Sequence, residues 1–188
     1  MDAEFLKQKF FAGLAYEAYV ATGNESQWQR WNAVYQAAGL TDAQRSLVSS
    51  FTRDMNLLIV SGVWCGDCIE QVPLIQRIAE AGRRISVRIV DRDQHADLSG
   101  RVHINGGARV PVVLFLAEDF ELCAWQGDRT ISRYRALAAK NIGPACSLGA
   151  VVPPAGQMHA TLADWLDEIE RVQLLLRLSP RLREKHGD

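Results

Sequence analysis

The hydrophobic positions in the first part of the chain follow a helical spacing. Leu6, Phe10 and Leu14 recur at every fourth position, which predicts one amphipathic helix that continues to Ala18. A second helix is expected over residues 25–38. Thr41-Asp42-Ala43-Gln44 has the form of a capping box and predicts the start of a third helix. We therefore expect a helical N-terminal extension over residues 1–54.

The pattern changes to short apolar runs of the kind that form buried strands. Strands are predicted at 56–61, 85–91, 110–116 and 120–125, the last two forming a hairpin. Between the first two strands a helical pattern runs from Ile69 to Ala79 and contains Pro73. A further helix is expected over 131–140. This order of elements predicts an α/β core over residues 55–140, with a central mixed sheet flanked by helices.

The last part of the chain combines a loop and a strongly apolar helix. Glycine and proline residues between Ile142 and Ala160 predict an irregular loop, and Thr161 is expected to open the final helix. Ser179-Pro180 should end that helix and leave a loose charged tail. We expect segment 141–188 to pack on the core or against a second subunit, because its helix is apolar almost all round: Leu162, Trp165, Leu166, Ile169, Val172, Leu174, Leu175, Leu176 and Leu178.

Composition narrows the classes of partner. The chain has 188 residues, 48% of them hydrophobic, and a formal net charge of −1, so neither nucleic acid nor a membrane is expected as a partner. The apolar stretch from Phe10 to Ala21 is short and contains Glu17, which is unlike a signal peptide or a transmembrane helix. We therefore expect a cytoplasmic protein, where structural disulfides are rare.

Two of the four cysteines stand in Cys65-Gly66-Asp67-Cys68, between a predicted strand and a predicted helix. The N-terminus of a helix stabilises a thiolate, which is the nucleophilic form of cysteine. Two intervening residues place the second sulfur within reach for closing a disulfide. Cys65 is then expected to attack a substrate disulfide, and Cys68 to resolve the mixed disulfide.

The chain resembles the thioredoxin superfamily in the residues around this motif. Trp64 precedes the first cysteine, Pro73 follows the second by five residues, and Val110-Pro111 precedes an apolar strand. The resemblance implies a thioredoxin-like fold, a cis-proline at Pro111, thiol–disulfide exchange without a cofactor, and an electron-donor reductase as partner. It also implies a surface for protein or small-molecule disulfides formed by Trp64, Gly66, Asp67, Val110, Pro111 and Gly127.

Two positions depart from the family pattern. Ile59 stands where typical thioredoxins have a buried aspartate, so the proton acceptor must come from elsewhere; Arg88 and Asp91 are candidates. Asp67 stands where thioredoxin has proline, on the side expected to be exposed. Its negative charge is expected to raise the pKa of Cys65 relative to a neutral residue and to make the couple more reducing.

Several alternatives remain open at this point. The two cysteines could be packing thiols, or could bind zinc or an iron–sulfur cluster with Cys123, Cys146, His95 or His103, although none of these is paired at ligand spacing. Cys123 is expected in the core and Cys146 in an exposed loop. Trp28, Trp31 and Tyr35 are expected to be core residues, or a substrate groove. The protein could also be a redox-inert binding module, or a reductase of small disulfides or peroxides.

Overall fold

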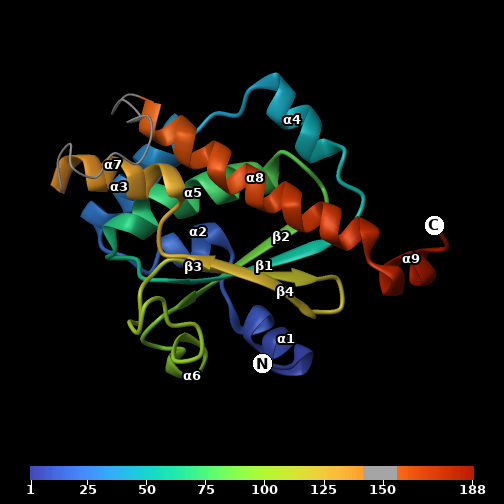
Figure 1. Ribbon diagram of the computed structural model, residues 1–188. Coiled ribbons are helices and arrows are strands. Elements are labelled where there is room, and N and C mark those ends of the chain that lie inside the picture. Colours follow the sequence, from blue (N-terminus) through green and yellow to red (C-terminus); the bar gives the residue numbers. More distant parts are fainter. Residues whose placement is uncertain (142–155) are drawn as a thin grey trace.

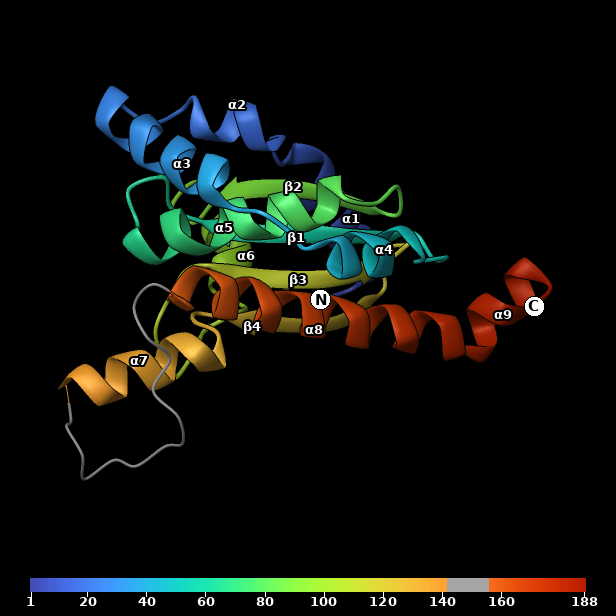
Figure 2. The same cartoon turned by 90° about the horizontal axis from the view of Figure 1, so that it is seen from above.

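The computed structural model describes residues 1–141 and 156–188, and its centre is a four-stranded mixed sheet (Figures 1 and 2). The strand order is β2-β1-β3-β4, with β1 parallel to β2 and the other neighbours antiparallel. The predicted strands are therefore confirmed, within two residues at their starts and ends. Their bounds are β1 Met55–Ser61, β2 Ile85–Asp91, β3 Val112–Ala117 and β4 Leu122–Gly127.

Helices cover both faces of the sheet. In Figure 1, α5 and α8 lie over one face, and α1 and α6 lie on the opposite side. The helix that follows the cysteine motif, α5, packs against both α3 and α8. The helices are α1 Ala3–Ala12, α2 Tyr16–Val20, α3 Glu25–Ala37, α4 Asp42–Ser49, α5 Gly66–Glu80, α6 Ala96–Ser99, α7 Ile131–Asn141, α8 Gln157–Leu178 and α9 Pro180–His186.

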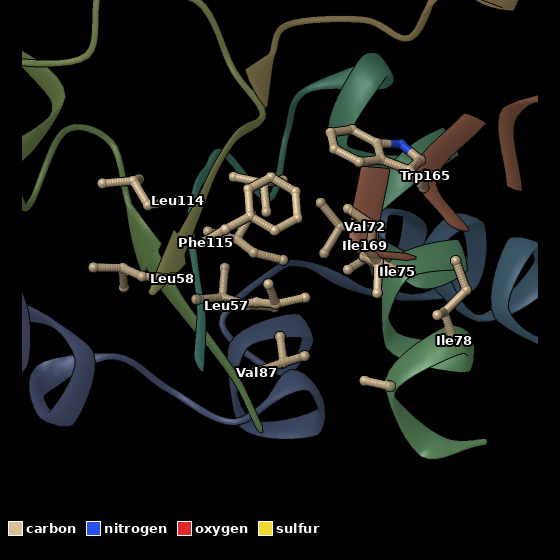
Figure 3. Packing of buried hydrophobic residues seen from close by; sticks show 14 of the residues in the cluster. Leu57, Leu58, Val72, Ile75, Ile78, Val87, Leu114, Phe115, Trp165 and Ile169 are labelled. Carbon is tan, nitrogen blue, oxygen red and sulfur yellow. The ribbon is translucent and has the colours of Figure 1, made fainter. Parts of the chain in front are cut away.

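The strand register sorts the core residues into two layers. Leu57 pairs with Val87 on one neighbouring strand and with Phe115 on the other, and Figure 3 shows these three side chains pointing toward α5 and α8. Leu58 and Leu114 point to the opposite face. All of these residues except Val87 are completely buried. Successive residues of a strand face opposite sides, so Ile59 and Ser61 lie on the same face as Leu57, toward α5.

The predicted first helix is interrupted. α1 ends at Ala12, and Leu14 forms an antiparallel bridge with Ile89, donating its N–H and accepting one in return at 2.8 and 2.9 Å. A Cβ at Gly13 would lie 3.0 Å from the Arg88 Cβ, so the chain crosses close to β2. The bridge gives hydrogen-bond partners to backbone groups on the outer edge of β2. These bonds explain why Leu14 leaves the helical pattern.

The other two helices of the extension follow the sequence closely. Asn24 and Gln27 form a capping box at the start of α3, and Thr41 and Gln44 form the predicted one at α4. Each box pairs two backbone N–H groups that have no partner within the helix. The two starts are therefore fixed by local chemistry.

The C-terminal part differs from the prediction in two ways. α8 begins at Gln157, four residues before Thr161, whose hydroxyl donates to the Gln157 carbonyl within the helix. The remainder of the predicted loop, 142–155, lies outside the described residues. The tail is not loose but forms α9, with Pro180 in its first turn and Leu182 completely buried. Ion pairs also hold it in place, from Lys185 to Glu118 at 2.6 Å, from Arg181 to Asp119 and from Asp188 to Arg53.

Within the part of the chain that the structure describes, no helix is both long and apolar enough to cross a membrane. The longest helix, α8, buries its Trp165 and Ile169 face against the core. Leu174, Leu175 and Leu178 remain exposed on it.

Candidate redox site

The cysteine motif lies where β1 passes into α5. β1 ends at Ser61, and Cys65 is the N-cap residue of α5. No side chain accepts a hydrogen bond at this cap, so the free N–H groups of the first turn are available to the Cys65 sulfur. Cys65 is half-buried, Cys68 is completely buried, and both thiols are free.

The two thiols have shifted pKa values in opposite directions. The Cys68 thiol, with the backbone N–H groups of Cys68 and Asp67, lowers the pKa of Cys65 to about 6, against burial and the Asp67 charge. Burial raises the pKa of Cys68 well above its ordinary value, and the neighbouring Cys65 adds to this effect. Cys65 is therefore the thiolate at neutral pH, and Cys68 is the thiol.

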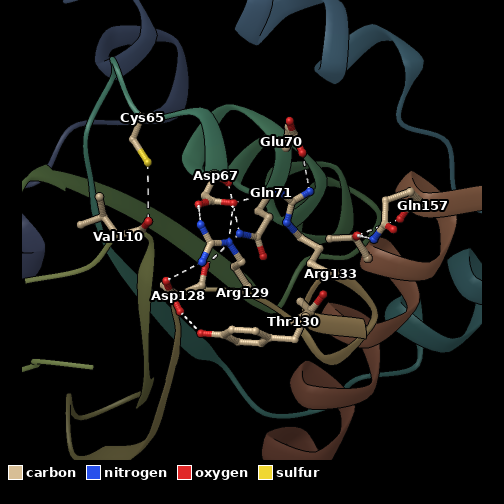
Figure 4. A network of polar contacts seen from close by, with 12 residues as sticks. Cys65, Asp67, Glu70, Gln71, Val110, Asp128, Arg129, Thr130, Arg133 and Gln157 are labelled. Carbon is tan, nitrogen blue, oxygen red and sulfur yellow. Dashed lines mark hydrogen bonds and ion pairs between the residues drawn. The ribbon is translucent and has the colours of Figure 1, made fainter. Parts of the chain in front are cut away.

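The Val110–Pro111 segment lies opposite Cys65. The Val110–Pro111 peptide bond is cis, and the Cys65 thiol points at the Val110 carbonyl oxygen at 3.6 Å (Figure 4). Gly127 pairs with Val112, and a Cβ at Gly127 would lie 2.5 Å from the Pro111 carbonyl oxygen. Gly127 thus leaves room for the backbone that faces Cys65, rather than lining a surface with a side chain of its own.

Trp64 and Gly66 flank Cys65 on the solvent side. The Trp64 ring is 47% exposed, and the Arg92 guanidinium lies over it at 4.8 Å. A Cβ at Gly62 would lie 2.8 Å from this ring, so Gly62 allows the indole to fold back on its own loop. Gly66 is exposed, and no atom would contact a Cβ there. Steric contact therefore explains why residue 62 is a glycine, but it does not explain the glycine at residue 66.

Asp67 is not the isolated carboxylate expected from the motif. Arg129 contacts it with two nitrogens, at 3.0 and 2.5 Å, and Arg133 donates to it at 2.8 Å (Figure 4). Arg133 also pairs with Glu70. All three members of the Asp67 cluster are mostly buried. The sequence prediction of an exposed Asp67 is wrong, because Arg129, just before α7, and Arg133, within α7, both pair with it.

Asp128 joins this cluster to the backbone of β4. Its carboxylate accepts from Tyr134, from Arg109 at 3.3 Å and from Arg129 at 3.2 Å, while Gln71 donates to its carbonyl at 2.9 Å. Burial alone would raise the pKa of Asp128, but these partners outweigh it and hold the pKa below its ordinary value. Asp128 is therefore charged and links α5 to the start of α7.

A family model described as thioredoxin matches residues 13–133, more than half of the chain. The chain belongs to the thioredoxin family. Among solved structures it is similar to a Pseudomonas aeruginosa protein of unknown function, with 23% identity over 87% of this chain and 96% of the other, and a TM-score of 0.68. It is also similar to an HIV epitope scaffold, with 21% identity, the same coverages and a TM-score of 0.66. Among curated proteins, no sequence matches significantly.

At these identities the two solved structures support the fold alone. The mixed sheet, the flanking helices and the family match together show the thioredoxin-like fold expected from the sequence. The matched range begins at Gly13, so it includes α2, α3 and α4 as well as the sheet.

The position of the missing family aspartate is completely apolar. Ile59 is completely buried, and the next residue on the same face of β1 is Ser61, also completely buried. Neither proposed substitute reaches the thiols: Arg88 lies over the Phe10 ring at 5.8 Å, and Asp91 accepts the N–H groups of Asp93 and Gln94. Tyr19 of α2 lies close enough to both thiols for their charges to raise its pKa, and sequence spacing alone could not identify it.

The remaining candidates are dispersed. His95 contacts Lys9 at 3.5 Å, and His103 is exposed. Cys123 is half-buried in β4 rather than a core residue, and Cys146 lies outside the described residues. Across residues 1–141 and 156–188, no three His, Cys, Asp or Glu side chains are grouped to hold a metal ion.

The aromatic residues of α3 divide between core and surface. Trp31 is completely buried and donates its indole N–H to the Val63 carbonyl at 2.8 Å, directly behind the motif. Tyr35 donates to Glu80 and stacks on Tyr16 at 5.3 Å. Trp28 is 45% exposed, so the core prediction is wrong for it. α3 therefore supports the loop before Cys65 from the side of the N-terminal extension.

Proposed function

We propose that this protein is a cytoplasmic thiol–disulfide oxidoreductase that acts mainly as a reductant. The observation that carries the proposal is the pairing of a half-exposed Cys65 of lowered pKa, at the N-terminus of α5, with a completely buried Cys68 one turn further on. A reactive, accessible thiolate next to a protected thiol is the arrangement that two-step disulfide exchange requires.

The reaction proceeds in two displacements. The Cys65 thiolate attacks one sulfur of a substrate disulfide, forming a mixed disulfide and releasing the other sulfur as a thiolate. Cys68 then attacks the Cys65 sulfur, and the second substrate sulfur leaves and takes up the proton that Cys68 loses. The substrate gains two electrons and becomes a dithiol, and Cys65–Cys68 becomes a disulfide. An external dithiol, supplied in the cell by an electron-donor reductase, restores the starting state.

The surface around Cys65 fits an extended disulfide-containing segment. Trp64 supplies an exposed aromatic face, and the Val110 backbone lies beside the sulfur, where strand-like pairing with a substrate is possible. Gly66 adds no side chain to this surface. We take proteins with accessible disulfides as the first substrate class.

Reduction of insulin by dithiothreitol tests the proposal. The wild-type protein is expected to accelerate insulin precipitation, Cys65→Ser is expected to abolish the acceleration, and Cys123→Ser serves as a matched control that keeps full activity. Wild-type activity no greater than that of Cys65→Ser would contradict the proposal and favour a redox-inert binding module. Activity on small disulfides but not on insulin would reassign the substrate class.

A further inference from the structure

Two buried hydroxyl groups next to Cys68 have no role in the two displacements described above. Ser61 is completely buried and Tyr19 is 1% exposed. Neither hydroxyl has a hydrogen-bond partner among the described residues. A buried polar group without a partner destabilises the folded protein. Such an arrangement is explained if an acceptor forms there during the reaction.

The strand geometry places Ser61 beside the resolving cysteine. Ser61 ends β1 two residues beyond Ile59, so strand alternation places it on the face of Leu57 and Ile59, toward α5. Ser61 lies close enough to the Cys68 thiol and to the Tyr19 hydroxyl to lower the pKa of each, although its hydroxyl has no hydrogen-bond partner in the described part of the resting protein. The Gly62 N–H is a further neighbour of the Cys68 sulfur. The three side chains therefore form a buried row from α2 through β1 to α5.

The N-terminal extension holds Tyr19 in this row. Leu14, just before α2, is bridged to Ile89 of β2, and the Tyr19 ring packs edge-on against Trp31 at 5.8 Å. Trp31 is in turn bonded to the Val63 carbonyl in the loop before Cys65. The tyrosine is thus fixed from two sides and cannot easily turn to another partner.

Both hydroxyls are donors rather than bases. Burial raises the pKa of Tyr19, and the nearby charges of Cys68, Asp91 and Cys65 raise it further, so the phenol keeps its proton. These three are the ionisable groups that face Tyr19, from α5 and from the end of β2. Asp91 is already engaged by two backbone N–H groups. The group that can gain negative charge within the row is the Cys68 sulfur.

We propose that Ser61 and Tyr19 form a donor pair that stabilises negative charge on the Cys68 sulfur while Cys68 resolves the mixed disulfide. Ser61 donates to the sulfur, and Tyr19 donates to the Ser61 oxygen. As the Cys65–Cys68 bond forms, the bond between Cys65 and the substrate sulfur breaks, and the Cys68 proton ends on the released substrate thiolate. Ser61 contacts the reacting sulfur, and Tyr19 is a positioning residue. This inference rests on the proposed function.

The two displacements can be timed separately with dithiobis(nitrobenzoate), an aryl disulfide that releases one coloured thiolate at each step. A background with Cys123→Ser and Cys146→Ser leaves only the motif to react. The first release reports attack by Cys65, and the second reports resolution by Cys68. Rates are measured by stopped flow across the neutral and alkaline range for the parent protein, Ser61→Ala, Tyr19→Phe and Tyr16→Phe.

The second release should slow by about tenfold in Ser61→Ala and by less in Tyr19→Phe, because a hydrogen bond to a developing charge is lost. Its pH midpoint should rise in both variants, while the first release stays within about twofold of the parent. Tyr16→Phe is the matched control: its hydroxyl is also buried without a partner, but its ring stacks on Tyr35. It should leave both releases unchanged.

An unchanged second release and midpoint in the folded Ser61→Ala and Tyr19→Phe proteins would overturn the donor pair. If one variant fails to fold, the other decides the question. A parent protein that releases no second thiolate would instead refute the proposed function itself. The two failures are therefore distinguishable.

Discussion

The Asp67 side and the core side of the Cys65–Cys68 turn differ in how their charged and polar groups are paired. On the Asp67 side, the mostly buried carboxylate is paired with Arg129 and Arg133, so its charge is compensated before any reaction begins. On the core side, the hydroxyls of Ser61 and Tyr19 have no partner among the described residues. The Asp67 charge is thus compensated in the resting protein, whereas the Ser61 and Tyr19 hydroxyls are donors that, within residues 1–141 and 156–188, have no acceptor before the reaction begins.

This difference assigns separate tasks to the two sides. Compensated charges near a thiolate act mainly on its pKa, and they do so modestly because attraction and repulsion nearly cancel. Buried donors act on a charge that exists only during the reaction, and preorganised donors of this kind are most effective in a dry site. The Asp67 side should therefore adjust the pKa of Cys65, and the core side should govern the rate at which Cys68 resolves the mixed disulfide.

The largest effect on Cys65 should come from its partner thiol. Cys68 is the main cause of the lowered Cys65 pKa. Cys68→Ala removes this donor, so the pH midpoint of Cys65 alkylation by iodoacetamide should rise by about one to two pH units. A midpoint that stays near that of the wild type would show that the helix N-terminus alone holds the thiolate.

Smaller and opposite effects should come from the ion pairs of Asp67. Asp67→Asn removes the negative charge nearest to Cys65 and leaves Arg129 and Arg133 in place, so the pH midpoint of Cys65 alkylation should fall. Arg129→Gln leaves the Asp67 charge less compensated and should raise that midpoint. We expect about half a pH unit in each direction. The double variant should return close to the wild type. Arg45→Gln is the matched control, since it breaks an exposed ion pair with Asp42 that is not part of the Asp67 cluster.

Shifts of the same sign in Asp67→Asn and Arg129→Gln would contradict the compensated cluster. The sequence argument considered only the repulsion between Asp67 and Cys65. That contribution does raise the pKa of Cys65, yet the net pKa is lowered to about 6, because hydrogen bonds from Cys68 and the backbone outweigh it.

Local signals predicted much of the fold and of the motif. The four strands, the capping box of α4, and the strand-to-helix position of Cys65 depend on neighbouring residues, whose patterns are visible in the sequence. Trp64, Pro73 and Val110-Pro111 could be found because they have fixed spacings around the cysteines or lie directly before an apolar strand.

Long-range contacts account for what the sequence did not reveal. Leu14 fits a helical pattern but gains more by pairing with Ile89, and the charged tail folds as α9 because Leu182 and Asp188 find partners. The same holds at the site: Arg129 lies 62 residues from Asp67 in sequence, and Tyr19 comes from the extension. No spacing rule connects such residues.

The account depends most directly on Cys65 being the reactive thiolate and Cys68 the protected thiol. Iodoacetamide alkylation of the reduced wild-type protein, followed over pH and assigned to each cysteine by mass spectrometry, measures both properties at once. The thiolate is the reactive form, so a lowered pKa moves reactivity to lower pH. We predict modification of Cys65 with a midpoint near pH 6, the value given by its pKa, while Cys68 remains unmodified. A midpoint near that of an ordinary thiol, or earlier modification of Cys68, would contradict the account.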